Sequence, residues 1–309
     1  MALGRFAVAL SMLSVSSAAA IAADLSLPPR PYAPYAPAYY HSAVVYEWTG
    51  FYVGLSAGGG FGLGGINNTI TSAFCNITAA GCDPNQASSA SVAAVPGGFD
   101  KTHPSGFIGG GQIGYNYQMG WFVWGVEADF SGADINGSNS KTATATIVDT
   151  NTTPNRTIVD TISGTAHQKL DWFGTLRGRV GFVPFTPLLV YATGGLAYGH
   201  VSADANLSET GVLIVATMPI TTLPLSGTTA TASTSSTQWG WTVGGGAEWM
   251  FAPHWSLKAE FLYYDLGHVS ADMTLTQLSA SGVPFTTIGI TSRVNFNGDI
   301  ARGGINYRF

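Results

Sequence analysis

The stretch WFVWGVEADF, residues 121–130, alternates between apolar and polar residues with a period of two. In an extended strand Phe122, Trp124 and Val126 fall on one face. Glu127 and Asp129 fall on the opposite face. This pattern predicts a β-strand whose apolar face and charged face meet different surroundings.

Four further segments repeat this alternation, at 105–118, 171–182, 239–251 and 255–264. In each of them aromatic and aliphatic residues oppose glycine, polar and charged residues. A Lys or Arg on the lipid face of a membrane barrel costs about 2–4 kcal/mol near the midplane, so we expect the charged faces to point inward. The predicted interior charge network is Glu127, Asp129, Arg177, Arg179, Glu248, Lys258, Glu260 and Arg302.

The composition favours strands over helices as membrane-spanning elements. Charged residues make up only 9% of the 309 residues, and glycine occurs 40 times. No run of about 18 apolar residues follows the N-terminal region, which argues against a helical membrane protein. The formal net charge of −5 argues against a nucleic-acid partner.

The connections between the predicted strands alternate in length. Short turns near 119–120, 184–187 and 252–254 alternate with long segments rich in Ser and Thr. Short turns on one rim and long loops on the other are typical of bacterial outer-membrane barrels. We therefore predict an all-β fold, an eight-stranded antiparallel transmembrane β-barrel with short periplasmic turns and long extracellular loops. Its strands are expected at 49–61, 106–118, 121–133, 167–183, 187–201, 237–251, 254–268 and 293–309.

A soluble two-sheet sandwich would also alternate, but it would expose rows of Trp and Phe. Aromatic residues near the predicted strand ends instead indicate interfacial girdles. Eight strands leave an interior that side chains can fill, so we expect a plugged polar lumen. The residues assigned to the girdles are Trp48, Trp121, Trp239, Trp249, Trp255, Tyr263 and Tyr264. The long loops contain Val/Thr alternations, such as 142–149, that predict either hairpins extending beyond the membrane or disordered tips.

The N-terminal region divides into two predicted segments. Residues 1–23 carry Arg5, an apolar run and small residues before Asp24, which predicts a secretory signal peptide. Residues 24–47 include PPRPYAPYAPAYY at 28–40, which predicts a Pro-rich periplasmic leader because proline lacks the ladder donor. The barrel is then expected to occupy 48–309.

The two cysteines, Cys75 and Cys82, lie close together in a predicted loop. In an exported protein this spacing favours one loop disulfide, with two free thiols as the alternative.

The last predicted strand, RVNFNGDIARGGINYRF, does not alternate evenly. Apolar residues fall at even positions in 293–300 and at odd positions in 305–309. We therefore predict a β-bulge within 299–303, or a loop hairpin that runs into the strand.

Three segments resemble a known family: WTGFYVG at 48–54, DWFGTLRGRVG at 171–181 and GINYRF at 304–309. Together they are similar to the small outer-membrane immunogenic-protein family of α-proteobacteria, a branch of the OmpA-like eight-stranded barrels. The resemblance implies a monomer in the bacterial outer membrane, surrounded by its lipid and lipopolysaccharide and inserted by the barrel assembly machinery. It implies no catalytic residue, although some members of the family are described as haemin-binding or as porins; for this chain we expect no cofactor. The C-terminal assembly signal that it implies is Ile305, Tyr307 and Phe309.

The expected function is a structural surface protein that contributes to envelope integrity. A narrow porin-like channel for small solutes and haemin or ligand binding by the loops are alternatives. A lipid-modifying enzyme is least favoured. Its only support is GHVSAD, which occurs at 199–204 and 267–272 and resembles the His-x-Ser pair of lipid A deacylases. Strand parity predicts His200 toward lipid and His268 toward the lumen, so the two copies would not form one site.

Overall fold

The computed structural model describes residues 46–75, 98–99, 103–149, 154–217, 219–278 and 284–309. The predicted signal peptide, most of the leader and Cys82 lie outside these residues, and with Cys82 the predicted Cys75–Cys82 disulfide. In the part of the chain that is described, no helix is long and apolar enough to span a membrane.

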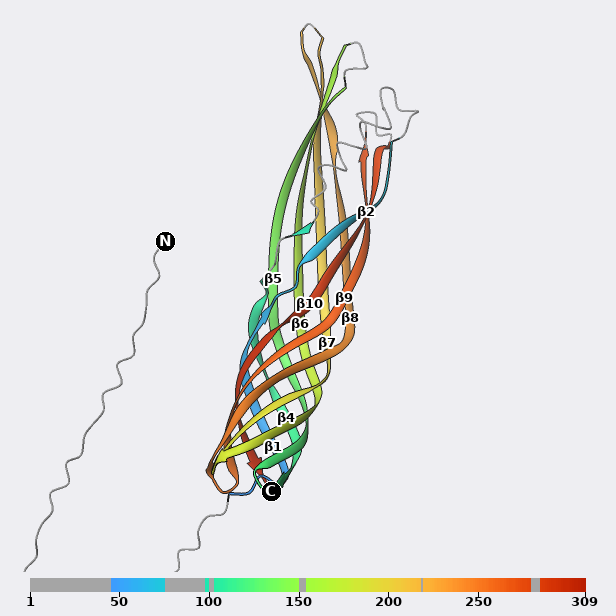
Figure 1. The fold of residues 1–309 in the computed structure, drawn as a ribbon. Coiled ribbons are helices and arrows are strands. Elements are labelled where there is room, and N and C mark those ends of the chain that lie inside the picture. Colours follow the sequence, from blue (N-terminus) through green and yellow to red (C-terminus); the bar gives the residue numbers. More distant parts are fainter. Residues whose placement is uncertain (1–45, 76–97, 100–102, 150–153, 218, 279–283) are drawn as a thin grey trace, which may run out of the picture. The chain divides into compact units, whose positions relative to one another are not determined.

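Eight antiparallel strands form a closed ring, in which β1 pairs with both β4 and β10 (Figure 1). Beyond the ring, β2 (Ile66–Cys75) pairs with β10, and β3 (Gly98–Phe99) pairs with β2. The predicted eight-stranded barrel is therefore confirmed. The ring strands are β1 (Gly50–Gly62), β4 (Ser105–Met119), β5 (Phe122–Asp149), β6 (Arg156–Phe185), β7 (Leu188–Val215), β8 (Thr221–Ala252), β9 (Trp255–Leu278) and β10 (Pro284–Arg308).

The outer wall of the ring carries two belts of aromatic contacts. The belt at the turn end, where the short connections lie, includes Trp121 against Phe122 and Trp255 against Tyr307. Trp239 and Trp249 lie on β8, one in each belt. At about 3.3 Å per residue and a tilt of about 40°, the chain between them spans about 25 Å, the height of an outer-membrane apolar band. The belt at the loop end joins Phe130, Trp172, Tyr198 and Trp239, with Trp241 against Tyr263 beside them.

Two aromatic residues assigned to the girdles from the sequence lie elsewhere. Trp48 is buried inside the turn end, and Tyr264 packs in the interior against Phe173. Proximity to a strand end does not determine which face of the wall a residue occupies. Tyr264 alternates with the outward residues of its strand and therefore points inward, and Trp48 lies before β1 begins.

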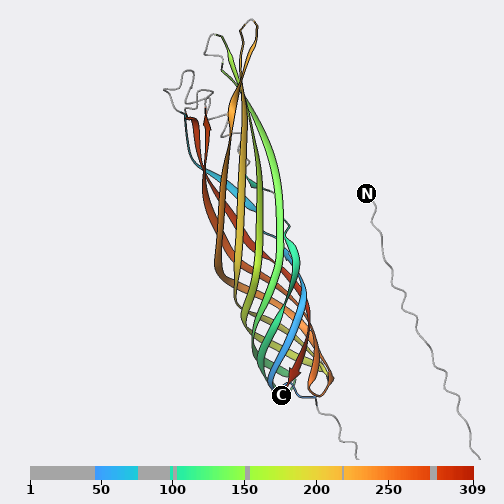
Figure 2. The same cartoon turned by 180° about the vertical axis from the view of Figure 1, so that it is seen from behind.

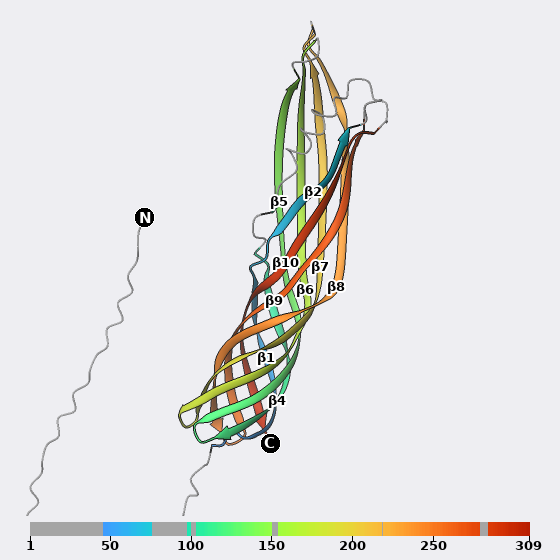
Figure 3. The same ribbon diagram turned by 45° about the vertical axis from the view of Figure 1, so that its right-hand side comes forward.

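Beyond the loop-end belt the barrel continues as two stacked sheets (Figures 1 and 2). β8 and β9 pair from Trp241 down to Ala252 but meet above Trp241 only at Ser226. The strands β5, β6, β7 and β8 thus form one sheet, whereas β9, β10 and β2 form the other (Figure 3). The Val/Thr-rich loops are therefore extended hairpins. Their inward residues form an apolar core made of Ile162, Ala205, Leu207, Ala230, Met273, Leu275, Ile288 and Ile290.

The predicted bulge in the closing strand is wrong, whereas its alternative, a loop hairpin that runs into the strand, is present: β10 continues unbroken from its hairpin with β9 into the wall of the ring. The even-numbered residues of β10 from Ser292 to Arg308 are buried, apart from the half-buried Gly304, and its pairing with β1 is regular through 299–303. The chemistry of the interior changes instead, from charged at Arg302 to apolar at Ile300. The bulge lies on the neighbouring strand β9, at Gly267, whose φ of 78° glycine adopts without a Cβ clash.

We expect the membrane boundary to be measurable by arginine substitution on β8. Val243 is an outward residue between the belts, whereas Thr231 points outward above the loop-end belt. V243R should lower the free energy of unfolding by about 2–4 kcal/mol, since it places a charge in lipid. T231R should change it by less than about 0.5 kcal/mol. Urea unfolding in lipid vesicles, followed by tryptophan fluorescence, measures both, and equal effects would contradict the assigned band.

Candidate functional site

The interior of the ring is layered along the barrel axis. At the turn end an apolar layer contains Trp48, Val123, Leu189, Tyr191 and Met250. A belt of buried charges follows, and a larger apolar cluster that includes Phe173, Leu262 and Ile300 lies above it. The charged belt is therefore enclosed by apolar side chains on both sides.

Arg177 lies at the centre of the charged belt. Its guanidinium is fully buried and forms an ion pair with Glu127. It also contacts Asp129 at 2.9 Å through Nη2 and Glu260 at 3.0 Å through Nη1. Three carboxylates on two strands thus share one arginine, which compensates much of the cost of burying them.

Two more cations complete this cluster. Lys258 Nζ lies 2.8 Å from Glu127 Oε1. Arg302 Nη2 lies 2.8 Å from both Asp129 Oδ2 and Glu260 Oε2. Because each carboxylate contacts two or more cations, the ion pairs form a network rather than isolated bridges.

A second cluster lies beside the first. Arg179 Nη2 donates to Glu248 Oε2 at 2.9 Å. Tyr52 joins the two clusters, since its hydroxyl donates to Glu127 Oε2 at 2.7 Å and accepts from Arg179 Nη1 at 2.9 Å. The Arg179 guanidinium also stacks 4.1 Å from the centre of the Tyr191 ring, a favourable cation–π distance. All eight residues of the predicted charge network therefore lie together in the interior.

The predicted network named only charged residues and left out their neutral hydrogen-bond partners. Thr175 donates to Asp129 at 2.6 Å, and Ser256 and Asn306 donate to Glu248 at 2.6 and 2.9 Å. Lys258 Nζ also donates to Gln112 at 3.1 Å. The alternation of the strands placed these residues on the inward faces. Burying an uncharged polar group costs less than burying a charge, so neutral residues indicate the inward face less strongly than charged residues do.

Arg308 is a further interior cation that the predicted network did not include. Its guanidinium lies 4.6 Å from the Trp48 ring centre and donates to the Glu47 carbonyl at 2.9 Å. It lies 3.7 Å from Glu248. The penultimate residue thereby anchors the segment before β1 in the turn end of the barrel.

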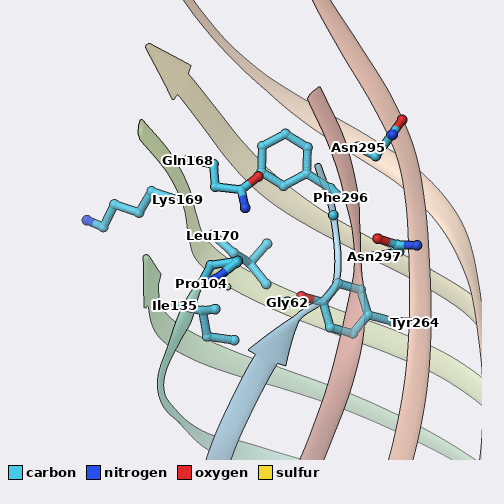
Figure 4. Close-up of a pocket in the computed structure, with 11 residues that line it drawn as sticks. Gly62, Pro104, Ile135, Gln168, Lys169, Leu170, Tyr264, Asn295, Phe296 and Asn297 are labelled. Carbon is cyan, nitrogen blue, oxygen red and sulfur yellow. The ribbon is translucent and has the colours of Figure 1, made fainter. Parts of the chain in front are cut away.

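A small cavity lies above the charged belt. A cavity of about 10 Å³ lies among residues that include Gly62, Pro104, Ile135, Leu170 and Tyr264 (Figure 4). Holding one water molecule takes about 10–15 Å³ on this measure. This cavity therefore has room for about one water molecule at most.

The two GHVSAD copies lie on different strands, β7 and β9, and do not come together in one site. His200 faces outward as predicted, with its ring stacked on Trp172 and its Nε2 2.9 Å from Ser235 Oγ. His268 is exposed on the outer surface, so its predicted lumen position is wrong. The bulge at Gly267 shifts the parity of β9 there.

The C-terminal residues Ile305, Tyr307 and Phe309 lie on the outer wall at the turn end. Ile305 and Phe309 are 37% and 71% exposed, and Tyr307 packs edge-to-face against Trp255 and Phe309. The backbone N–H of Phe309 donates to the Phe51 carbonyl at 3.0 Å. This places an aromatic ring at the predicted interface, and the role as an assembly signal stays a prediction.

A family model and a curated relative agree with this architecture. Residues 6–309 match the family model described as an outer membrane protein beta-barrel domain. The 31 kDa outer-membrane immunogenic protein of Brucella melitensis is 32% identical over 265 residues, 85% of each chain. The 22 kDa outer membrane protein of Rhizobium leguminosarum bv. viciae is 30% identical over 53% of this chain and 54% of its own. The solved structure of OprG from Pseudomonas aeruginosa aligns over 85% of this chain and 98% of its own, at 11% identity and a TM-score of 0.35.

Proposed function

The chain belongs to the family of outer membrane protein beta-barrel domains, and from that premise we propose that it strengthens the bacterial outer membrane as a closed surface barrel. The function is structural: the ring anchors the protein in lipid, and the two-sheet extension stands above the membrane. The protein works as a monomer among outer-membrane lipid and lipopolysaccharide, and the barrel assembly machinery inserts it.

The observation that carries this proposal is the filled interior. Arg177, Asp129 and Glu260 have no exposed side-chain surface, although they lie where a porin would keep water. The apolar clusters on both sides of the charged belt would hinder ions further, because moving a charge through an apolar layer is costly. Both features disfavour the channel alternative.

Deleting the gene tests the structural role. We expect the deletion strain to admit a nonpolar fluorescent dye several-fold faster than the parent, because the envelope loses a sealed barrel. Uptake of small sugars should stay unchanged. Re-expressing the protein should restore the barrier, whereas an unrelated open porin at the same level should not. A strain with an intact dye barrier but reduced sugar uptake would contradict the proposal and support a channel.

A further inference from the structure

The outer face of the β5–β8 sheet above the loop-end belt is a grid of small polar side chains. Every second residue of 136–142, 163–169, 202–208 and 229–235 points outward, and the strand register sets them in rows. Ser and Thr hold most of these positions. Neighbouring hydroxyls interact across strands, as Thr142 and Ser163 do at 3.0 Å.

A shallow polar pocket lies in this grid close to the membrane. Its volume is about 260 Å³, just below the usual range of small-molecule sites and enough for a single sugar ring. Two registered rows supply its outward side chains: Asn136, Lys169 and Ser202 in one, and Ser138, His167 and Asp204 in the other.

The chemistry of the pocket selects among ligand classes. Its one lysine, Lys169, already lies 2.7 Å from Asp171, and Asp204 adds a further negative charge, so the pocket suits a phosphate poorly. None of the described grid positions holds Trp, Tyr or Arg, the residues that dominate protein–protein hot spots. Hydroxyl, amide and carboxylate groups that both donate and accept match a polyhydroxylated ligand.

The distance of the pocket from the membrane identifies the source of such a ligand. Lys169 lies three positions along β6 from Trp172 of the loop-end belt. This spacing places Lys169 about 8 Å from that belt, on the side away from the membrane. In a bacterial outer membrane the layer just outside the hydrocarbon is the saccharide of lipopolysaccharide. We propose that this pocket binds a core sugar of the lipopolysaccharide that surrounds the barrel. This site goes beyond the structural function and does not depend on whether the lumen conducts.

Calorimetric titration with soluble core oligosaccharide, released by mild acid from rough-type lipopolysaccharide, tests the site on the full chain folded in detergent. The wild type should bind, and the double variant S202A/D204A should bind about tenfold more weakly, since it loses polar partners of the sugar. The matched variant N206A/S208A changes the next two outward positions of β7, outside the pocket, and should bind like the wild type within about twofold.

Heat-modifiable migration on gels verifies that each variant is folded before titration. No binding by the wild type, or an equal loss in both variants, would overturn the site. Equal affinity for a neutral dextran of similar length would overturn its assignment to the lipopolysaccharide core. Neither result would bear on the dye-barrier experiment, so the two proposals can fail independently.

Discussion

Replacing Arg177 by methionine is expected to lower the free energy of unfolding of the barrel by about 3–5 kcal/mol. The change keeps much of the side-chain volume but leaves Glu127, Asp129 and Glu260 without the cation that they share. Removing one partner of a buried ion pair is strongly destabilising, because the remaining charges have no access to water. Urea unfolding in lipid vesicles, followed by tryptophan fluorescence, measures the loss.

Lys169→Met supplies the matched control. Lys169 also forms an ion pair, with Asp171 at 2.7 Å, but about half of its side chain is exposed, at 48%. An exposed pair contributes less than about 1 kcal/mol, so K169M should be nearly neutral. If R177M cost no more than K169M, the interior network would not be the buried element described above.

Deleting Phe309 is expected to damage assembly far more than stability. In the folded barrel the deletion removes an exposed ring and one backbone hydrogen bond to Phe51, which together are worth about 1 kcal/mol. In cells the amount of protein in the outer membrane should fall to a small fraction of the wild-type level, because the truncated strand no longer ends on an aromatic residue. Fractionation and immunoblotting of outer membranes measure this amount, and refolding in detergent measures stability.

Phe309→Tyr keeps the aromatic ring and should assemble like the wild type. Normal outer-membrane levels of the truncated chain would refute the role of Phe309 as an assembly signal. Equal loss of refolding yield and of outer-membrane level would instead indicate a purely structural role.

The lipid-embedded half of the barrel could be predicted from the sequence because lipid penalises errors heavily. A charge such as Arg177 or Lys258 has to face inward, so five alternating segments sufficed to orient the wall. The predicted strand boundaries at the turn end also agree with those of the structure, since proline and glycine mark those turns.

The upper half could not be predicted in the same way, because both faces change chemistry there. Above the loop-end belt the wall meets water, so Ser and Thr point outward and residues such as Leu207 and Ile288 point inward. An alternating pattern does not identify the inward face when the surroundings of the outer wall change from lipid to water along one strand. This is why the even spacing of Val294 and Ile300 left open a bulge, which β10 does not have, or a loop hairpin, which it forms with β9.

Side chains close the interior of the ring, and single-channel recording in planar lipid bilayers is the direct test of this closure. The purified full chain should insert without producing stable conductance steps of the size seen for porins, because the charged belt and the apolar layers fill the ring. A reproducible, long-lived open state of porin size in the wild-type protein would contradict this account.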